Sequence, residues 1–167
     1  MSLEEIAKKM CAKGKGILAA DESTGTMDKR LKSVGIESTE KNRLHFRETL
    51  FTADAIKDYI GGVILFDETI RQKINSGISV PALLAKNNSL VGIKVDKGAK
   101  QLAGSPEETV TEGLDGLRER LNEYYKLGAR FTKWRAVYNI GEKYPSAQSI
   151  KSNAHALARY AAIVQEA

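Results

Sequence analysis

The sequence predicts an α/β fold in which parallel strands alternate with helices. Short apolar segments of strand length alternate four times with longer segments of helical periodicity. This alternation requires parallel strands joined by crossover helices. In addition, charged residues stand at or just beyond the end of each strand-like segment. That placement is typical of a site at the carboxyl ends of a parallel sheet.

The first half of the chain runs through this order twice. Residues 2–12 have helical spacing, and residues 16–20 form an apolar strand that stops at Asp21. A second helix follows, with Leu31 and Val34 expected to face inward. Next come a helix over residues 39–53 and a buried strand over residues 61–66, which ends in Asp67 and Glu68. The expected apolar stripe of the 39–53 helix consists of Phe46, Leu50 and Ala53.

The second half contains two expected strands with cationic residues near their carboxyl ends. Residues 90–95 carry Lys94 near their end, and residues 131–135 place Lys133 and Arg135 on one face. An exposed edge strand would also show such charges. Their recurrence at several strand ends favours a site instead.

A short helix is expected near residues 81–85, and three further segments complete the chain. Residues 96–108 are expected to form a long functional loop. An amphipathic helix follows, marked by Val110, Leu114, Leu117, Leu121 and Tyr124. The last helix is marked by Ile150, Ala154, Leu157, Ala161 and Val164.

The amino-acid composition limits the classes of partner and ligand that the chain is expected to bind. The net charge of +5 comes from dispersed residues, which fits phosphorylated small molecules and disfavours nucleic acid as the main partner. The single cysteine, Cys11, excludes an internal disulfide and fits a reducing, cytoplasmic compartment. No apolar run reaches membrane length, and two distant histidines offer no zinc-type cluster. We therefore expect no membrane partner, no metal and no cofactor.

The residues after the first strand have two interpretations. Ser23 and Thr26 precede a helix, and hydroxyls in this position most often cap the helix. Hydroxyls, free N–H groups and the positive helix end also favour a phosphate. The sequence alone leaves both open.

Four strand–helix units fit either a doubly wound sheet or half of a (β/α)₈ barrel. A complete barrel needs roughly 200–250 residues, and this chain has 167. The last helical pattern has no Gly or Pro after Val164. These features hint at a truncated half-barrel that comprises the first four β/α units, but no residue pattern alone separates it from a doubly wound sheet.

Five segments resemble class I fructose-1,6-bisphosphate aldolases, in that family's order and spacing. They are Leu18-Ala-Ala-Asp-Glu-Ser-Thr-Gly25, Gly61-Gly-Val-Ile-Leu-Phe66, Gly92-Ile-Lys-Val-Asp-Lys-Gly98, Leu114-Asp-Gly-Leu117 and Phe131-Thr-Lys-Trp-Arg135. The resemblance implies a (β/α)₈ barrel, with residues 1–167 as the amino-terminal half of one domain. It also implies a homotetrameric glycolytic and gluconeogenic lyase. Such an enzyme cleaves fructose 1,6-bisphosphate to dihydroxyacetone phosphate and glyceraldehyde 3-phosphate through a lysine Schiff base.

The resemblance also implies roles for eight residues. Asp21 would handle hydroxyl protons around C–C cleavage, and Lys133 would assist the carbinolamine step electrostatically. The remaining six would bind substrate: Lys94, Arg135, Ser23 and Thr26 at the 6-phosphate end, Arg30 near the 1-phosphate, and Arg43 as another substrate-linked arginine. From spacing alone, Arg30 and Arg43 fit solvated helix cations equally well.

The Schiff-base lysine of the family would lie beyond Ala167, as would its paired glutamates, its serine–glycine phosphate loop and its terminal tyrosine. The chain alone is therefore expected to be inactive. Three interpretations remain. The chain is half of an aldolase left by an incomplete gene or by cleavage, or a non-catalytic half-barrel that acts as a binding or assembly module, or part of another phosphate-binding barrel. The five segments disfavour the third.

Overall fold

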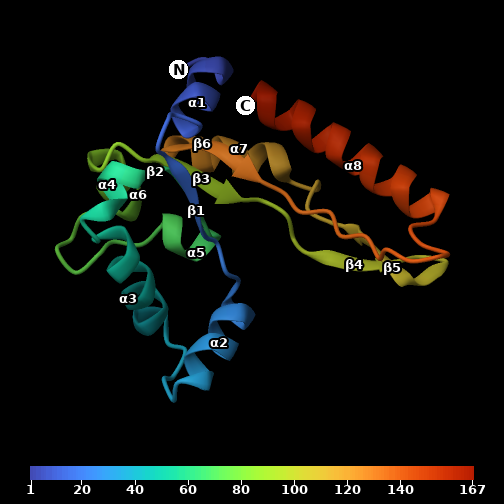
Figure 1. Cartoon of the computed structure of the whole chain (residues 1–167), viewed down its shortest axis with the longest axis horizontal. Helices are drawn as coiled ribbons and strands as arrows, with labels where there is room; N and C mark the ends of the chain where they lie inside the picture. The colour runs from blue at the N-terminus through green and yellow to red at the C-terminus, as the bar shows by residue number, and fades with distance from the viewer. The chain divides into compact units, whose positions relative to one another are not determined.

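The computed structural model describes all 167 residues (Figure 1). They form two compact units. The first unit comprises Met1–Lys94 and Tyr124–Thr132, and the second comprises Val95–Glu123 and Lys133–Ala167. A four-stranded sheet has the order β1-β2-β3-β6, and a separate hairpin pairs β4 with β5. The pairing of β1 with β2 and of β2 with β3 is parallel, which confirms the predicted fold class.

The strands are β1 (Gly16–Ala20), β2 (Ile60–Leu65), β3 (Leu90–Lys94), β4 (Ala99–Leu102), β5 (Ser105–Thr111) and β6 (Ala129–Lys133). The helices are α1 (Leu3–Met10), α2 (Thr24–Ser33), α3 (Glu40–Phe51), α4 (Ala55–Tyr59), α5 (Asp67–Ile70), α6 (Val80–Lys86), α7 (Leu117–Lys126) and α8 (Ala147–Glu166). None of these helices combines the length and the apolar character that a membrane span requires.

Side-chain caps explain where several helices of the first unit begin. The hydroxyls of Ser2, Ser23, Thr39 and Ser79 each accept a hydrogen bond from a backbone N–H in the first turn of the helix that follows. At Ser2, Glu5 completes a capping box. In Figure 1, β1 runs from α1 at its amino end to α2 at its carboxyl end.

Two glycines and one aromatic ring set the packing of the central strands. A Cβ at Gly92 on β3 would lie 2.3 Å from Cζ of Phe131, and one at Gly62 on β2 would lie 3.0 Å from Cε1 of the same ring. The ring therefore packs directly on the backbone of both strands. By contrast, β1 stands at an edge of the sheet, and its Ile17 is 47% exposed.

In the second unit, the β4–β5 hairpin is joined to α8 by polar side chains. The buried carboxylate of Glu108 accepts hydrogen bonds from the Ser146 backbone N–H (2.8 Å), the Ser146 hydroxyl (2.5 Å) and the Ser105 hydroxyl (2.8 Å). Asn153 accepts from the Thr111 N–H at 3.3 Å and donates to the Thr109 carbonyl at 2.9 Å. These bonds fix the helix to the hairpin.

The predicted loop over residues 96–108 is wrong, because most of it forms the hairpin. Thr109, Val110 and Thr111 have the β-branched side chains that favour strands, so Val110 lies in β5 and α7 begins only at Leu117. The last strand of the four-stranded sheet ends at Lys133, so Arg135 lies beyond it, contrary to the expected strand over residues 131–135.

Three predicted helix faces are also wrong. Val34 is exposed rather than inward, whereas Leu31 is buried as predicted. In α3 the buried side chains are Arg47 and Phe51, and Leu50 is exposed. In α8 the buried face consists of Ser149, Asn153 and Ala156, whereas Ile150 is exposed. Arg47 in α3 and Asn153 in α8 take inward positions because they find hydrogen-bond partners there.

Candidate active site

Asp21 and Lys94 meet where β1 and β3 end. Asp21 is buried, and Lys94 is the last residue of β3. Nζ of Lys94 donates a hydrogen bond to the Asp21 carbonyl oxygen at 2.6 Å and lies 3.9 Å from Oδ2 of the Asp21 carboxylate. The same Nζ lies 4.9 Å from the ring centroid of Phe66, the residue that follows β2. The carboxyl ends of three parallel strands thus converge on one ammonium group.

Ser23 and Thr26 cap α2. The Ser23 hydroxyl accepts from the Thr26 backbone N–H at 3.4 Å, and the two side-chain oxygens lie 3.1 Å apart. The capping interpretation is therefore confirmed. Ser23 is half-buried and Thr26 is exposed, so both hydroxyls remain accessible while they cap the helix. The binding of a phosphate at these hydroxyls stays a prediction.

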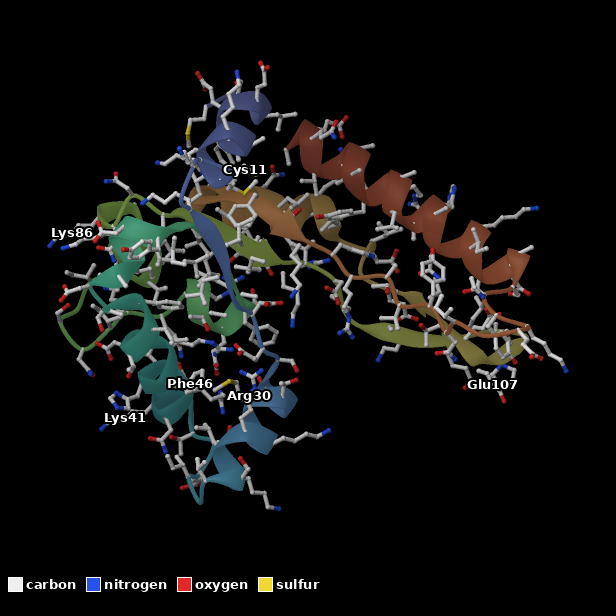
Figure 2. All side chains as sticks on the ribbon, viewed as in Figure 1. Cys11, Arg30, Lys41, Phe46, Lys86 and Glu107 are labelled. Carbon is white, nitrogen blue, oxygen red and sulfur yellow. The ribbon has the colours of Figure 1, made fainter.

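The two arginines predicted to bind substrate each hold a carboxylate. Arg30 on α2, labelled in Figure 2, donates to Oε1 of Glu22 at 2.5 Å. Arg43 on α3 donates to both oxygens of Glu68, at 3.0 and 2.5 Å, and this hydrogen bonding raises the pKa of its guanidinium above the ordinary value. Arg30 is exposed and Arg43 is half-buried. Because each guanidinium is paired with a carboxylate, neither is an unpaired solvated cation.

A third arginine, Arg47, was not among the predicted site residues. It is fully buried and is the largest side chain in the protein with that property. Its guanidinium donates to the Ala20 carbonyl at 3.1 Å and to the Glu22 carbonyl at 2.6 Å. Burial lowers the pKa of Arg47, while the charges of Glu22 and Glu68 oppose that shift. The sequence carried one signal, because Arg47 is four residues before Phe51 and so shares its helix face.

Lys133 and Arg135 belong to the second unit. Lys133 ends β6 and is half-buried, and its carbonyl accepts from the Val95 N–H at 3.1 Å. Arg135 is exposed, and its carbonyl accepts from the Thr111 hydroxyl at 2.7 Å. The backbone positions of both residues are therefore fixed within their own unit.

No group of three His, Cys, Asp or Glu side chains is arranged to hold a metal ion. Within the first unit, Lys94 meets Asp21, and Arg30 and the α2 cap lie at the residues that follow β1, whereas Arg43 holds Glu68 after β2. Such an arrangement, with one buried carboxylate among several cations, suits an anionic substrate that undergoes proton transfer.

The fold and these residues agree with comparisons to known proteins. The family model for class I fructose-bisphosphate aldolase, a glycolytic enzyme, matches residues 2–167. The chain belongs to this family. A probable fructose-bisphosphate aldolase class 1 of Xanthomonas campestris is 62% identical over 164 residues, which cover 98% of this chain and 49% of the relative.

Two more distant proteins agree. The cytoplasmic isozyme 1 of fructose-bisphosphate aldolase from Pisum sativum is 54% identical over 160 residues, or 96% of this chain and 45% of the relative. The solved structure of the Plasmodium falciparum aldolase, in complex with TRAP and a small-molecule inhibitor, has 47% identity and a TM-score of 0.93. That match covers 96% of this chain and 47% of the solved chain. The chain thus spans about half the length of the relatives it matches.

Proposed function

We propose that this chain supplies half of the barrel, and one side of the active site, of a class I fructose-bisphosphate aldolase. The reaction is the reversible cleavage of fructose 1,6-bisphosphate to dihydroxyacetone phosphate and glyceraldehyde 3-phosphate. In this proposal the lysine that forms the Schiff base lies outside residues 1–167, so the chain alone is inactive. The contact between Lys94 and Asp21 at the ends of β3 and β1 is the observation that carries the proposal.

The proposal assigns two kinds of role. Asp21 is the proton-transferring carboxylate, and Lys133 is the auxiliary cation near the nucleophile. Clustered positive charge disfavours protonation of a nearby amine, which makes that amine nucleophilic near neutral pH.

The substrate-binding residues are Lys94, Arg135, Ser23 and Thr26 at one phosphate, Arg30 near the other, and Arg43 as another substrate-linked arginine. The carboxylates that hold Arg30 and Arg43 support this assignment, because a phosphate can replace a carboxylate on a guanidinium with similar geometry.

Residues 1–167 would then be the amino-terminal half of one (β/α)₈ domain. The name of the pea relative supports a cytoplasmic enzyme, and the family resemblance supports a homotetramer. The exposed edge strand β1 favours a second candidate, a non-catalytic half-barrel that pairs with another chain as an assembly module.

A chimera tests the enzyme proposal. Residues 1–167 are joined to the part of the Xanthomonas campestris relative that follows its matched region. We expect the chimera to cleave fructose 1,6-bisphosphate in a coupled assay that detects both triose phosphates. A folded, tetrameric chimera without cleavage activity would contradict the proposed function and favour the assembly module.

A further inference from the structure

The buried Arg47 has no assigned role, and its contacts centre on Asp21. A buried guanidinium is costly unless several acceptors compensate it. Its two hydrogen-bond acceptors are the carbonyls of Ala20 and Glu22, the residues on either side of Asp21. Neutralising buried carboxylates would not require hydrogen bonds to the backbone on both sides of Asp21.

The carbonyl of Asp21 is held as well, by Nζ of Lys94 at 2.6 Å. Three consecutive carbonyls at the end of β1 therefore each accept a hydrogen bond from a cationic side chain. Charge-assisted hydrogen bonds are roughly twice as strong as neutral ones. Together these three hydrogen bonds restrict the backbone of Asp21. The Cα atom that carries the Asp21 carboxylate is therefore held in one position.

Arg47 also lies between the two carboxylates that hold the outer arginines. Nη2 is 3.8 Å from Oε2 of Glu22, and Nη1 is 3.8 Å from Oε2 of Glu68. Glu22 in turn binds Arg30, and Glu68 binds Arg43. The five charges form one row, which we call the arginine–glutamate row, with Arg47 at its centre.

We propose that Arg47 is a positioning residue for the aldolase reaction, because it fixes the backbone on both sides of Asp21 and so sets the place of the proton-transferring carboxylate. This proposal rests on the proposed function. Arg47 touches neither substrate nor reacting atoms. It acts through Asp21, and its guanidinium fork is what lets one side chain reach two carbonyls at once.

The test uses Arg47→Lys in the chimera, because lysine keeps the charge but lacks the planar fork. We expect kcat for cleavage of fructose 1,6-bisphosphate to fall about 10- to 100-fold, as for a small displacement of a catalytic group. KM should stay within about twofold, since the phosphate-binding side chains remain. Trapping of dihydroxyacetone phosphate by borohydride should stay at the parental level, because Schiff-base formation does not need Asp21 in this assignment.

Two comparisons separate positioning from general stability. In an Asp21→Asn background, Arg47→Lys should cause no further loss of kcat, since its effect passes through the Asp21 carboxylate. Arg118→Lys is the matched control, because Arg118 is an exposed arginine paired with Glu166, outside the candidate site. It should leave kcat, KM and trapping at parental values.

Each remaining outcome has a definite meaning. An unchanged kcat in Arg47→Lys, or an equal loss of trapping and cleavage, would overturn the positioning role. If Arg47→Lys does not fold, Arg47→Gln carries the same test, because glutamine is neutral and also lacks the fork. If neither variant folds, Arg47 stabilises the fold and the positioning role is wrong. A parental chimera that folds but cannot cleave substrate overturns the proposed function first, and the positioning role falls with it.

Discussion

Glu108 on β5 accepts two hydrogen bonds from Ser146, one from its backbone N–H and one from its hydroxyl. The hydroxyl of Ser146 also caps α8, so the carboxylate sits at the junction of the hairpin and the longest helix. The side-chain hydrogen bond from Ser146 is the main cause of the lowered pKa of Glu108, and it outweighs the opposing effect of burial. Ionised Glu108 therefore stabilises the folded second unit.

The first prediction concerns the pH dependence of that stability. Because the pKa of Glu108 is lower in the folded state, its contribution is complete above the ordinary glutamate pKa and is lost as the pH falls through the lowered value. Urea unfolding of the chimera between pH 7 and pH 3 should show this loss. Glu108→Gln should reduce the stability at pH 7 and flatten the acid part of the profile. The control, Glu112→Gln at an exposed position, should keep the parental profile.

The second prediction concerns the contact between Gly92 and Phe131. Gly92→Ala should destabilise the chimera by about 1–3 kcal/mol, because the added methyl group would overlap the ring. Thermal unfolding measures the change. Gly141→Ala has open space at its Cβ and should change stability by less than about 0.5 kcal/mol. Gly92→Ala combined with Phe131→Leu should recover part of the lost stability, because the smaller side chain makes room for the methyl group. No recovery would contradict the overlap with Phe131 as the cause.

The third prediction concerns the chain by itself. Residues 1–167 incubated with dihydroxyacetone phosphate and borohydride should give no stoichiometric covalent adduct, because neither Lys94 nor Lys133 is assigned as the nucleophile. Mass spectrometry of the intact chain measures the adduct, with the chimera as the positive control. Stoichiometric labelling of either lysine would reverse the assignment of both as auxiliary cations.

The fourth prediction separates those two lysines in the chimera. Lys133→Ala should lower kcat by about 10²–10⁴-fold, because it removes a group that acts during proton transfer and carbinolamine chemistry. Lys94→Ala should act mainly by raising KM, since a phosphate contact is made equally before and during the reaction. A smaller loss of kcat should accompany it, because Nζ of Lys94 also holds the Asp21 carbonyl. Steady-state kinetics distinguish the two, and Lys86→Ala on the exposed end of α6 is the control. A collapsed kcat with normal KM in Lys94→Ala would exchange the two roles.

The fifth prediction concerns the open edges of the four-stranded sheet. The sheet order leaves β1 and β6 at its edges, and Ile17 on β1 is 47% exposed. Each apolar side chain left uncovered forgoes roughly 1.5–3 kcal/mol of burial, against a typical domain stability of about 5–15 kcal/mol. We therefore expect the isolated chain to self-associate or to be loosely packed. Light scattering and hydrogen exchange decide this, and a stable monomer with strongly protected β1 and β6 amides would contradict it.

Local patterns predicted the parallel sheet and most of its strands, because an apolar run of five or six residues that ends in a charge is encoded within the run itself. They also predicted charged residues at the carboxyl edge of the sheet, where the structure places Asp21 and Lys94, but they did not predict the contact between these two residues. Arg47 escaped prediction because its partners, the carbonyls of Ala20 and Glu22, lie 27 and 25 residues away. The local signal, its place four residues before Phe51 on one helix face, does not by itself identify an arginine as buried.

The hairpin and the buried face of α8 were not predicted from the sequence, for a related reason. Two of the three buried positions of α8, Ser149 and Asn153, are polar, and Asn153 bonds to Thr109 and Thr111 on β5 as well as to the Ser149 carbonyl. A search for apolar periodicity therefore selects the wrong side of the helix. In the same way, α3 buries a guanidinium where its sequence suggests a stripe through Leu50.

The arginine–glutamate row also has a consequence for the effect of ionic strength. Its outer member Arg30 has a side chain that is 55% exposed, whereas that of Arg47 is 0% exposed. Dissolved ions weaken exposed charge pairs far more than buried ones. Added salt therefore loosens the Arg30–Glu22 pair first, while Arg47 keeps its hold on the backbone around Asp21. Within one row, the pairing of Arg30 therefore depends on the salt concentration, whereas the hydrogen bonds of Arg47 do not.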